Sequence, residues 1–219
     1  MKIWKTILAA AALAMLSACA NQAPPKKDFS AFRDQHPRSI VVVPVVNRST
    51  QVDAPDNFLV TIPGYLAEKG YYVFPVHMVK RFMEDDGLAD ADLVHKADPV
   101  KVADLFGADA VMFITLETWQ SSYAVIATTT TVSVKYTLKH GHTGQTIWED
   151  QVTTAYSPQQ QNSSGNLLAN LIVQAVAAAV ERAKPSYLPL AQQANAIAFY
   201  GPEHGMATGP YDPLYGKDY

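Results

Sequence analysis

"TVSVKYTLKHGHTGQTIWEDQVTTAY", residues 131–156, decides the fold class, because it contains two strand-like runs joined by a legible turn. In the first run, apolar side chains at positions 132, 134, 136 and 138 alternate with polar ones, as in a strand with one buried face. Gly141 and Gly144 allow the backbone angles of a tight turn within "HGHTGQ". The stretch therefore predicts an antiparallel hairpin.

A third strand-like run, "ADAVMFITLETWQSSYAVI" at residues 108–126, precedes this hairpin. The apolar and β-branched stretch from 108 to 138 is too long for one ordinary strand, so we place a turn at "ATTTT", residues 127–131. That segment lacks Gly, Pro, Asn and Asp. The three runs together predict a three-strand antiparallel meander.

The chain before the meander alternates between strand and helix patterns. "SIVVVPVVN", residues 39–47, is a continuous β-branched run typical of a strand buried on both faces. Pro44 cannot donate to a sheet, which predicts an edge or a bulge at that residue. "YYVFPV", beginning at Tyr71, is a second short strand.

Helical spacing and end signals predict five helices. The first, 56–70, takes Asp56 as its cap and is interrupted at Pro63-Gly64; the helix at 98–107 has Asp98 as cap and Gly107 as stop. The others are 77–87, 166–184 and 188–199. This order of elements predicts an α/β fold, a mixed β-sheet with an antiparallel three-strand meander packed against helices.

The N-terminus has the layout of a secretory signal peptide over residues 1–18. Lys2 and Lys5 precede an apolar stretch from Ile7 to Leu16, and small residues follow. About ten residues at roughly 1.5 Å each are too short to cross a hydrocarbon core of about 30 Å. An uncleaved membrane helix and a chance cysteine after a plain signal peptide are the alternatives.

Leu16-Ser17-Ala18-Cys19 matches the bacterial lipobox, and Cys19 is the only cysteine of the chain. The resemblance implies that diacylglycerol is attached to the thiol of Cys19, that cleavage precedes it, and that its new amine is acylated. Two or more chains, at about 0.8 kcal/mol per buried methylene, give a stable anchor. Because Ala20 stands where inner-membrane retention uses aspartate, the resemblance implies the outer membrane; we expect the domain in the periplasm, with exposure at the cell surface as the alternative.

We therefore divide the chain into four parts. Residues 1–18 are the signal peptide, 19–38 the lipidated N-terminus and tether, 39–200 the periplasmic α/β domain, and 201–219 a tail rich in Gly, Pro and Tyr. The polar, proline-bearing tether can reach about 50 Å if extended. The tail can lie across its own domain, stay loose or dock onto a partner.

The totals exclude several classes of protein. The formal charge is -3, with no cluster of Lys and Arg, which argues against nucleic acid as a partner. One cysteine permits no intramolecular disulfide, thiolate zinc cage or CxxC pair. GxSxG, HExxH, GxxxxGK[ST] and GxGxxG are all missing, so we expect no enzyme and no cofactor.

Two groups of residues could hold a metal ion. His140 and His142 form an HxH, but the glycine between them places them in a turn, so solvated histidines are the better interpretation. Residues 84–86, "EDD", miss the spacing of a calcium loop and are interpreted as a solvated helix end. Aromatic residues in the strands, namely Trp119, Trp148, Tyr71 and Tyr72, are expected to be core or cross-strand partners.

Four stretches, "IVVVPVVNRS", "YLAEKGYYVFPV", "FGADAVMFITLETWQSSYAVI" and "TGQTIWED", resemble a family of Gram-negative outer-membrane lipoproteins that includes a genome-derived vaccine candidate. The resemblance covers residues 39–182. It implies a fold like the N-terminal domain of TolB and the periplasmic domains of CsgG and FlgT. It also implies a binding or assembly module, acting beside a CsgG-like outer-membrane lipoprotein in secretion or envelope maintenance.

Three functions follow from these observations. The leading hypothesis is a non-catalytic lipoprotein, held in the outer-membrane lipid bilayer through acylated Cys19, that binds a protein partner in an envelope or export assembly. The alternative is a carrier or sensor of a lipid or small ligand, which requires an apolar pocket between sheet and helices. The third is an envelope hydrolase whose site is assembled from scattered residues.

Overall fold

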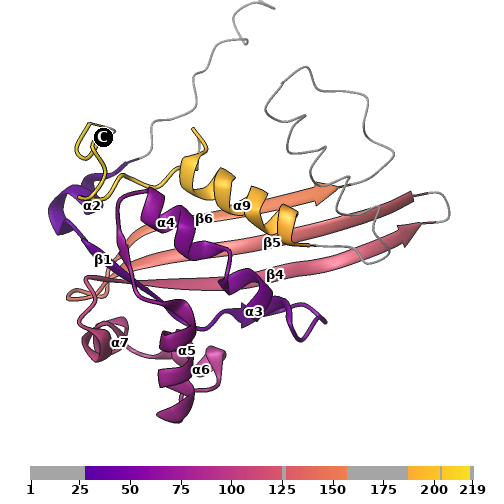
Figure 1. Cartoon of the computed structure of the whole chain (residues 1–219), viewed down its shortest axis with the longest axis horizontal. Coiled ribbons are helices and arrows are strands. Elements are labelled where there is room, and N and C mark those ends of the chain that lie inside the picture. Colours follow the sequence, from indigo (N-terminus) through magenta and orange to yellow (C-terminus); the bar gives the residue numbers. More distant parts are fainter. Residues whose placement is uncertain (1–27, 125–126, 157–186, 203, 218–219) are drawn as a thin grey trace, which may run out of the picture.

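The computed structural model describes residues 28–124, 127–156, 187–202 and 204–217. They form one mixed sheet with the strand order β3-β1-β4-β5-β6 (Figure 1). Three long strands make an antiparallel meander: β4 (Ala110–Ala124), β5 (Ala127–His140) and β6 (Thr146–Tyr156). β1 (Ser39–Val42) lies parallel to β4 and to the short edge strand β3 (Tyr72–Val73). The predicted fold class is confirmed.

Pro44 interrupts the first strand as predicted. β1 ends at Val42, opposite Met112, and β2 (Val46–Asn47) begins opposite Thr115. Four steps along this segment therefore match three steps along β4, because Pro44 has no N–H to donate to the ladder.

The turn predicted at residues 127–131 is wrong. These residues belong to β5, and Ala124 pairs with Ala127, so only two residues lie between the strands. The β-branched threonines there favour strand, and the two long strands pair along their full length. The turn predicted at 140–145 is confirmed: the N–H of His140 donates to the carbonyl of Gln145 at 2.8 Å, and Gly144 has a φ of +70°.

Helices cover both faces of the sheet. Their bounds are α2 Ser30–Gln35, α3 Ala54–Leu59, α4 Ile62–Glu68, α5 Val76–Asp85, α6 Ala91–Lys96, α7 Pro99–Phe106 and α9 Leu188–Tyr200. α7 has the predicted ends, since Asp98 accepts from the N–H of Val100 at 3.0 Å and Gly107 has a φ of +64°. The helix predicted at 166–184 lies outside the described residues.

The helix predicted at 56–70 is two helices, α3 and α4. The break falls at Val60 and Thr61, and Pro63 lies in the first turn of α4, where its missing N–H costs nothing. Asp56 is not the cap, as it lies inside α3, one turn after the capping position at Asp53.

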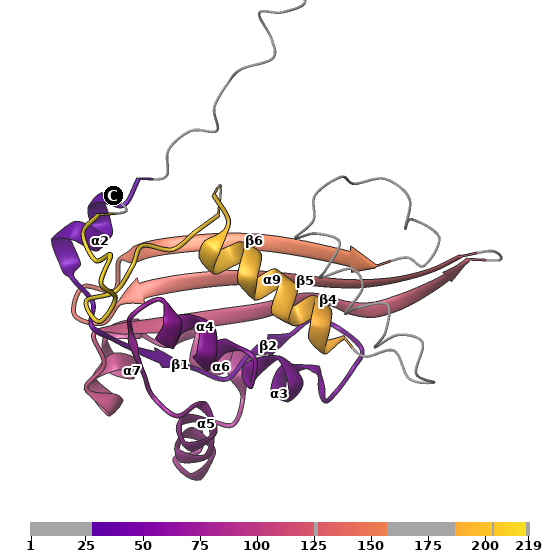
Figure 2. The same ribbon diagram turned by 45° about the horizontal axis from the view of Figure 1, so that its top comes forward.

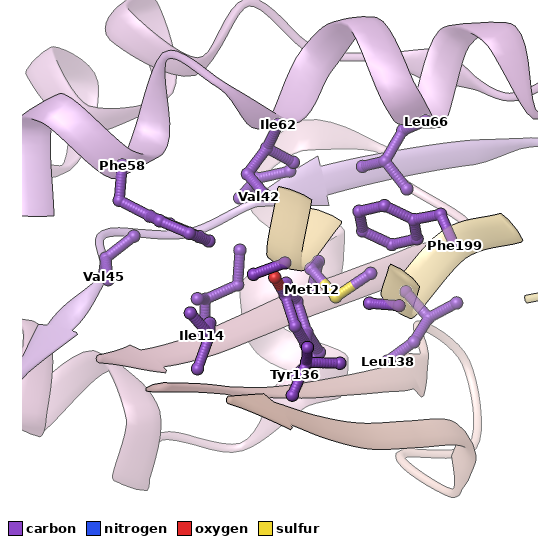
Figure 3. Packing of buried hydrophobic residues seen from close by; sticks show 14 of the residues in the cluster. Val42, Val45, Phe58, Ile62, Leu66, Met112, Ile114, Tyr136, Leu138 and Phe199 are labelled. Atoms are coloured by element: carbon purple, nitrogen blue, oxygen red, sulfur yellow. The ribbon is translucent and has the colours of Figure 1, made fainter. Parts of the chain in front are cut away.

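The larger core lies between the sheet and α3, α4 and α9 (Figure 3). Its largest fully buried side chains include Tyr136, Phe58 and Phe199. A chain of three polar side chains crosses this core. The hydroxyl of Tyr136 donates to Asn195 Oδ1 at 2.7 Å, and Asn195 Nδ2 donates to Thr61 Oγ1 at 2.8 Å. This pairing satisfies groups that would be costly if buried alone. A smaller core lies between β1, β4 and the helices α5, α6 and α7.

Both ends of the described chain belong to the folded domain. α2 lies within the segment assigned to the tether, and Phe32 in it is only 3% exposed, so the domain begins before Ser39. The tail lies across its own domain, one of the three possibilities above: the N–H of Gly209 donates to the carbonyl of Lys69 at 2.7 Å. Figures 1 and 2 place α2 and the C-terminal tail side by side at one end of the sheet.

Candidate interaction surface

The lipidation site predicted at Cys19 lies outside the described residues. In the part of the chain that is described, no helix is long and apolar enough to cross a membrane.

The two histidines of the predicted pair differ in their exposure to solvent. His142 is exposed, as expected, whereas His140 is only 6% exposed and its Nδ1 shares a hydrogen bond of 3.0 Å with Thr143 Oγ1. The expectation of a solvated His140 is therefore wrong, and burial lowers the pKa of its imidazole. Among the described residues no group of three His, Cys, Asp or Glu side chains could hold a metal ion.

The acidic triplet at residues 84–86 forms the end of α5, as predicted. Glu84 lies 3.7 Å from Lys80 Nζ, and Asp85 lies 3.1 Å from Arg81, one helical turn earlier in both cases. These are (i, i+4) pairs at the surface, half-buried for Lys80–Glu84 and exposed for Arg81–Asp85, and such pairs contribute little to stability.

Three of the predicted core aromatics are buried, and two of them hold the tail. Trp119, Trp148 and Tyr71 are 3%, 4% and 4% exposed. The indole N–H of Trp148 donates to the carbonyl of His204 at 3.4 Å, and the hydroxyl of Tyr71 donates to that of Ala207 at 2.9 Å. Tyr72 is a cross-strand partner, opposite Ser39 of β1, but it is not part of the core, since it is 52% exposed.

Tyr72 begins a chain of touching rings, which we call the aromatic row: Tyr72, Phe74, Phe106 and Phe82. Tyr72 meets Phe74 edge-on at 5.1 Å between ring centroids, Phe74 lies 6.2 Å from Phe106, and Phe106 meets Phe82 at 5.3 Å. The four side chains come from the edge strand β3, the loop after it, α7 and α5. The row therefore joins three elements that are separate in sequence.

The inner members of the row are anchored and the outer ones are open. Phe74 and Phe106 pack against the smaller core, while Phe82 is 48% exposed. Met78, one turn before Phe82 on α5, is 70% exposed, and Leu105, beside Phe106, is 46% exposed. A row with a fixed base and exposed rings can bury apolar side chains of another molecule without reorganising itself first.

The sequence contains a signal for this row. In "YYVFPV" a strand directs Tyr71 and Val73 to one side and Tyr72 and Phe74 to the other, so one pair faces away from the tail and the larger core. On α5, Val79 and Met83 already form a core stripe. Met78 and Phe82 form a second apolar stripe on the same helix, which is more than one buried face requires.

Two hollows on the surface carry mixed polar and charged linings. One, of about 360 Å³, lies on the open side of the meander and is lined by His95, Phe113, Thr115, Lys135, Thr137, Lys139, Thr146 and Glu149. The other, of about 230 Å³, lies beside α3 and α5, where Asp56 pairs with Lys80. Neither is an apolar cavity between the sheet and α9, where Tyr136 and Phe199 fill the space shown in Figure 3.

These features define a class: an α/β domain with a mixed sheet and a fixed aromatic surface. The chain belongs to the family described as "Putative lipoprotein GNA1162-like", whose model matches residues 27–211. It is 33% identical over 209 residues to the lipoprotein NMB1124/NMB1162 of Neisseria meningitidis serogroup B, across 93% of this chain and 94% of that protein. The crystal structure of lipoprotein GNA1162 from Neisseria meningitidis is similar, with a TM-score of 0.55 and 32% identity, covering 66% of this chain and 99% of that one.

Proposed function

We propose that this protein is a lipid-anchored, non-catalytic component of the cell envelope that binds a protein partner through the aromatic row. Membership of a lipoprotein family and the lipobox at Cys19 support the anchor. In this proposal the domain faces the periplasm from the outer membrane. Its partner is an envelope protein, for which a CsgG-like lipoprotein is our first choice, and its fold is of the TolB N-terminal type.

The single observation that carries the partner role is the exposure of the aromatic row. The buried centres of protein interfaces are enriched in aromatic residues and Met, and a few such side chains carry most of the binding free energy. Met78 and Phe82 present that combination on one helix face, at 70% and 48% exposure. Fully burying a side chain of this size contributes about 1.5–3 kcal/mol.

The charges beside the row favour protein over a lipid surface. Lys80 lies near Asp56 and Glu84, and Arg81 pairs with Asp85, so each of these cations on α5 has an acidic neighbour. Attraction to anionic lipid instead requires clustered cations. Mixed, paired charges around an apolar centre are the usual arrangement of a protein interface.

Photo-crosslinking in intact cells tests the proposal. A benzoylphenylalanine is placed at position 72 or at position 82 of the full chain, expressed at its native level, and adducts are identified by mass spectrometry. Because Tyr72 and Phe82 lie on β3 and α5 but in one row, we expect both positions to trap the same envelope protein.

The matched control is position 93. Leu93 is 58% exposed on the neighbouring helix α6 but is not part of the row. It should give no such adduct, and Met78→Ser should weaken the adducts at 72 and 82. Equal labelling at all three positions, or different partners at 72 and 82, would contradict the proposed site.

A further inference from the structure

A second exposed apolar feature lies at the opposite end of the sheet from the β4–β5 hairpin tip. It is the loop of residues 210–217, in which Tyr211 is 65% and Leu214 58% exposed (Figure 2). We call it the tail loop. It is separate in sequence from every member of the aromatic row and comes close to α2 instead.

The tail loop is an ordered turn with a fixed apolar tip. The N–H of Tyr211 donates to the carbonyl of Gly70 at 3.0 Å, and the N–H of Leu214 donates to Asp212 Oδ1 at 2.6 Å. The N–H of Lys217 donates to the carbonyl of Leu214 at 2.9 Å. Tyr211 and Leu214 are therefore held outward by the backbone around them, so little conformational entropy is lost when they become buried.

One contact links the tail loop to α2, at the end of the domain where the tether from Cys19 joins it. Tyr215 Oη and His36 Nδ1 share a hydrogen bond of 2.8 Å, and His36 closes α2. From Cys19 to Asp28, the first described residue, the chain has nine steps, which span at most about 32 Å when extended. The fifteen residues of β4 span about 50 Å. This part of the tether is thus shorter than the domain. With Cys19 anchored as proposed, the end of the domain that carries α2 and the tail loop is the end nearest the bilayer.

We propose that the tail loop is a lipid-contacting foot, on which Tyr211 and Leu214 rest in the headgroup region beside the acylated Cys19. This inference rests on the anchor of the proposed function. Tyrosine suits the boundary because its ring is apolar and its hydroxyl stays hydrated. Lys217, at the end of the tail loop, adds a cation that suits phosphate headgroups.

Even a weak affinity of the tail loop for lipid is enough to keep the two in contact. Because the tether keeps Asp28 within about 32 Å of Cys19, and Tyr215 of the tail loop contacts His36 at the end of α2, contact is intramolecular and has a high effective concentration. The contact orients the domain. The end with α2 faces the lipid, and the end where β4 stops and β5 begins faces away from it.

A single cysteine label tests the foot. Acylation blocks the only native thiol, so Leu214→Cys creates the one reactive position in the full chain. The acylated protein is labelled with an environment-sensitive fluorophore and placed in protein-free vesicles of phosphatidylethanolamine and phosphatidylglycerol. We expect a blue-shifted emission and quenching by lipids that carry a quencher in the headgroup region. Tyr211→Ser in the same chain should reduce that quenching at least twofold.

The matched control is Val52→Cys, because Val52 is 92% exposed in the segment before α3. Its label should keep the emission seen in water and escape quenching. If the label at 214 behaves like the label at 52, or is shielded only when a partner protein is added, the foot is wrong. Mass analysis of the N-terminal peptide separates the two proposals: a foot that fails on an acylated Cys19 leaves the anchor intact, whereas an unmodified Cys19 overturns the anchor and the foot with it.

Discussion

The two faces of the sheet differ in how completely their helices bury apolar side chains. On one face, α3, α4 and α9 close a core in which Phe199 stacks on Trp148 at 5.7 Å and the Tyr136–Asn195–Thr61 chain satisfies the buried polar groups. On the other, α5, α6 and α7 close a smaller core over β1 and the start of β4, and they leave the outer members of the aromatic row, Tyr72 and Phe82, exposed. Apolar side chains on the first face are buried in one large core, while the second face combines a smaller core with exposed rings at Tyr72 and Phe82.

Removing one phenylalanine from each face should separate the two roles. Phe199→Ala should lower the free energy of unfolding by about 3–5 kcal/mol, because it leaves a cavity among Tyr136, Trp148 and Tyr65. Phe82→Ala, at a side chain that is 48% exposed, should cost less than about 1 kcal/mol. Urea unfolding of both variants, followed by circular dichroism, measures the difference. Equal losses would show that the row is part of the stabilising core.

A smaller loss is expected from the polar chain inside the first face. Asn195→Ala leaves the hydroxyls of Tyr136 and Thr61 without that partner and should cost about 1–3 kcal/mol. Tyr136→Phe should cost a similar amount. Because the two residues share one hydrogen bond, the double variant should lose clearly less than the sum of the single variants. Additive losses in a double-mutant cycle would mean that the pair is not coupled.

The smallest effect is a pH dependence on the second face. The Nε2–H of His95 donates to the carbonyl of Pro44 at 3.0 Å, and burial lowers the pKa of His95 below its usual 6.5. The unfolded chain then binds the proton more readily, so stability is complete above pH 6.5 and falls as the pH drops below it. His95→Asn should reduce that fall between pH 7.5 and 5.5 in urea titrations, and the buried His140, whose pKa is also lowered, should account for a remaining part.

Local patterns predicted most of the fold from the sequence. Alternation and the two glycines predicted the β5–β6 hairpin, and Asp98 with Gly107 predicted both ends of α7, because those signals act within a few residues. The β4–β5 turn was misplaced because strands of 15 and 14 residues exceed the usual length. What allows such strands is pairing between them, which no local pattern contains.

The candidate surface was harder to predict, because it depends on tertiary contacts. Met78 and Phe82 lie within the helix predicted at 77–87, but exposure of that stripe depends on Val79 and Met83 taking the core positions. The ring contacts from Phe74 to Phe106 join residues over 30 positions apart. The tail loop shows the same limit: its composition left three possibilities open, and only the hydrogen bonds to Lys69 and Gly70 distinguish them.

Those last hydrogen bonds constrain how the molecule is made. Phe199, Met206 and Ala207 complete the larger core, and Gly209 crosses Gly70 so closely that an added Cβ would lie 2.3 Å from the Gly70 carbonyl oxygen. A nascent chain emerges from its N-terminus, so Ile40 and Phe58 are available long before the segment that seals them in. The larger core is therefore complete only once residues 199–209 have joined it, however early the first strand and α3 are made.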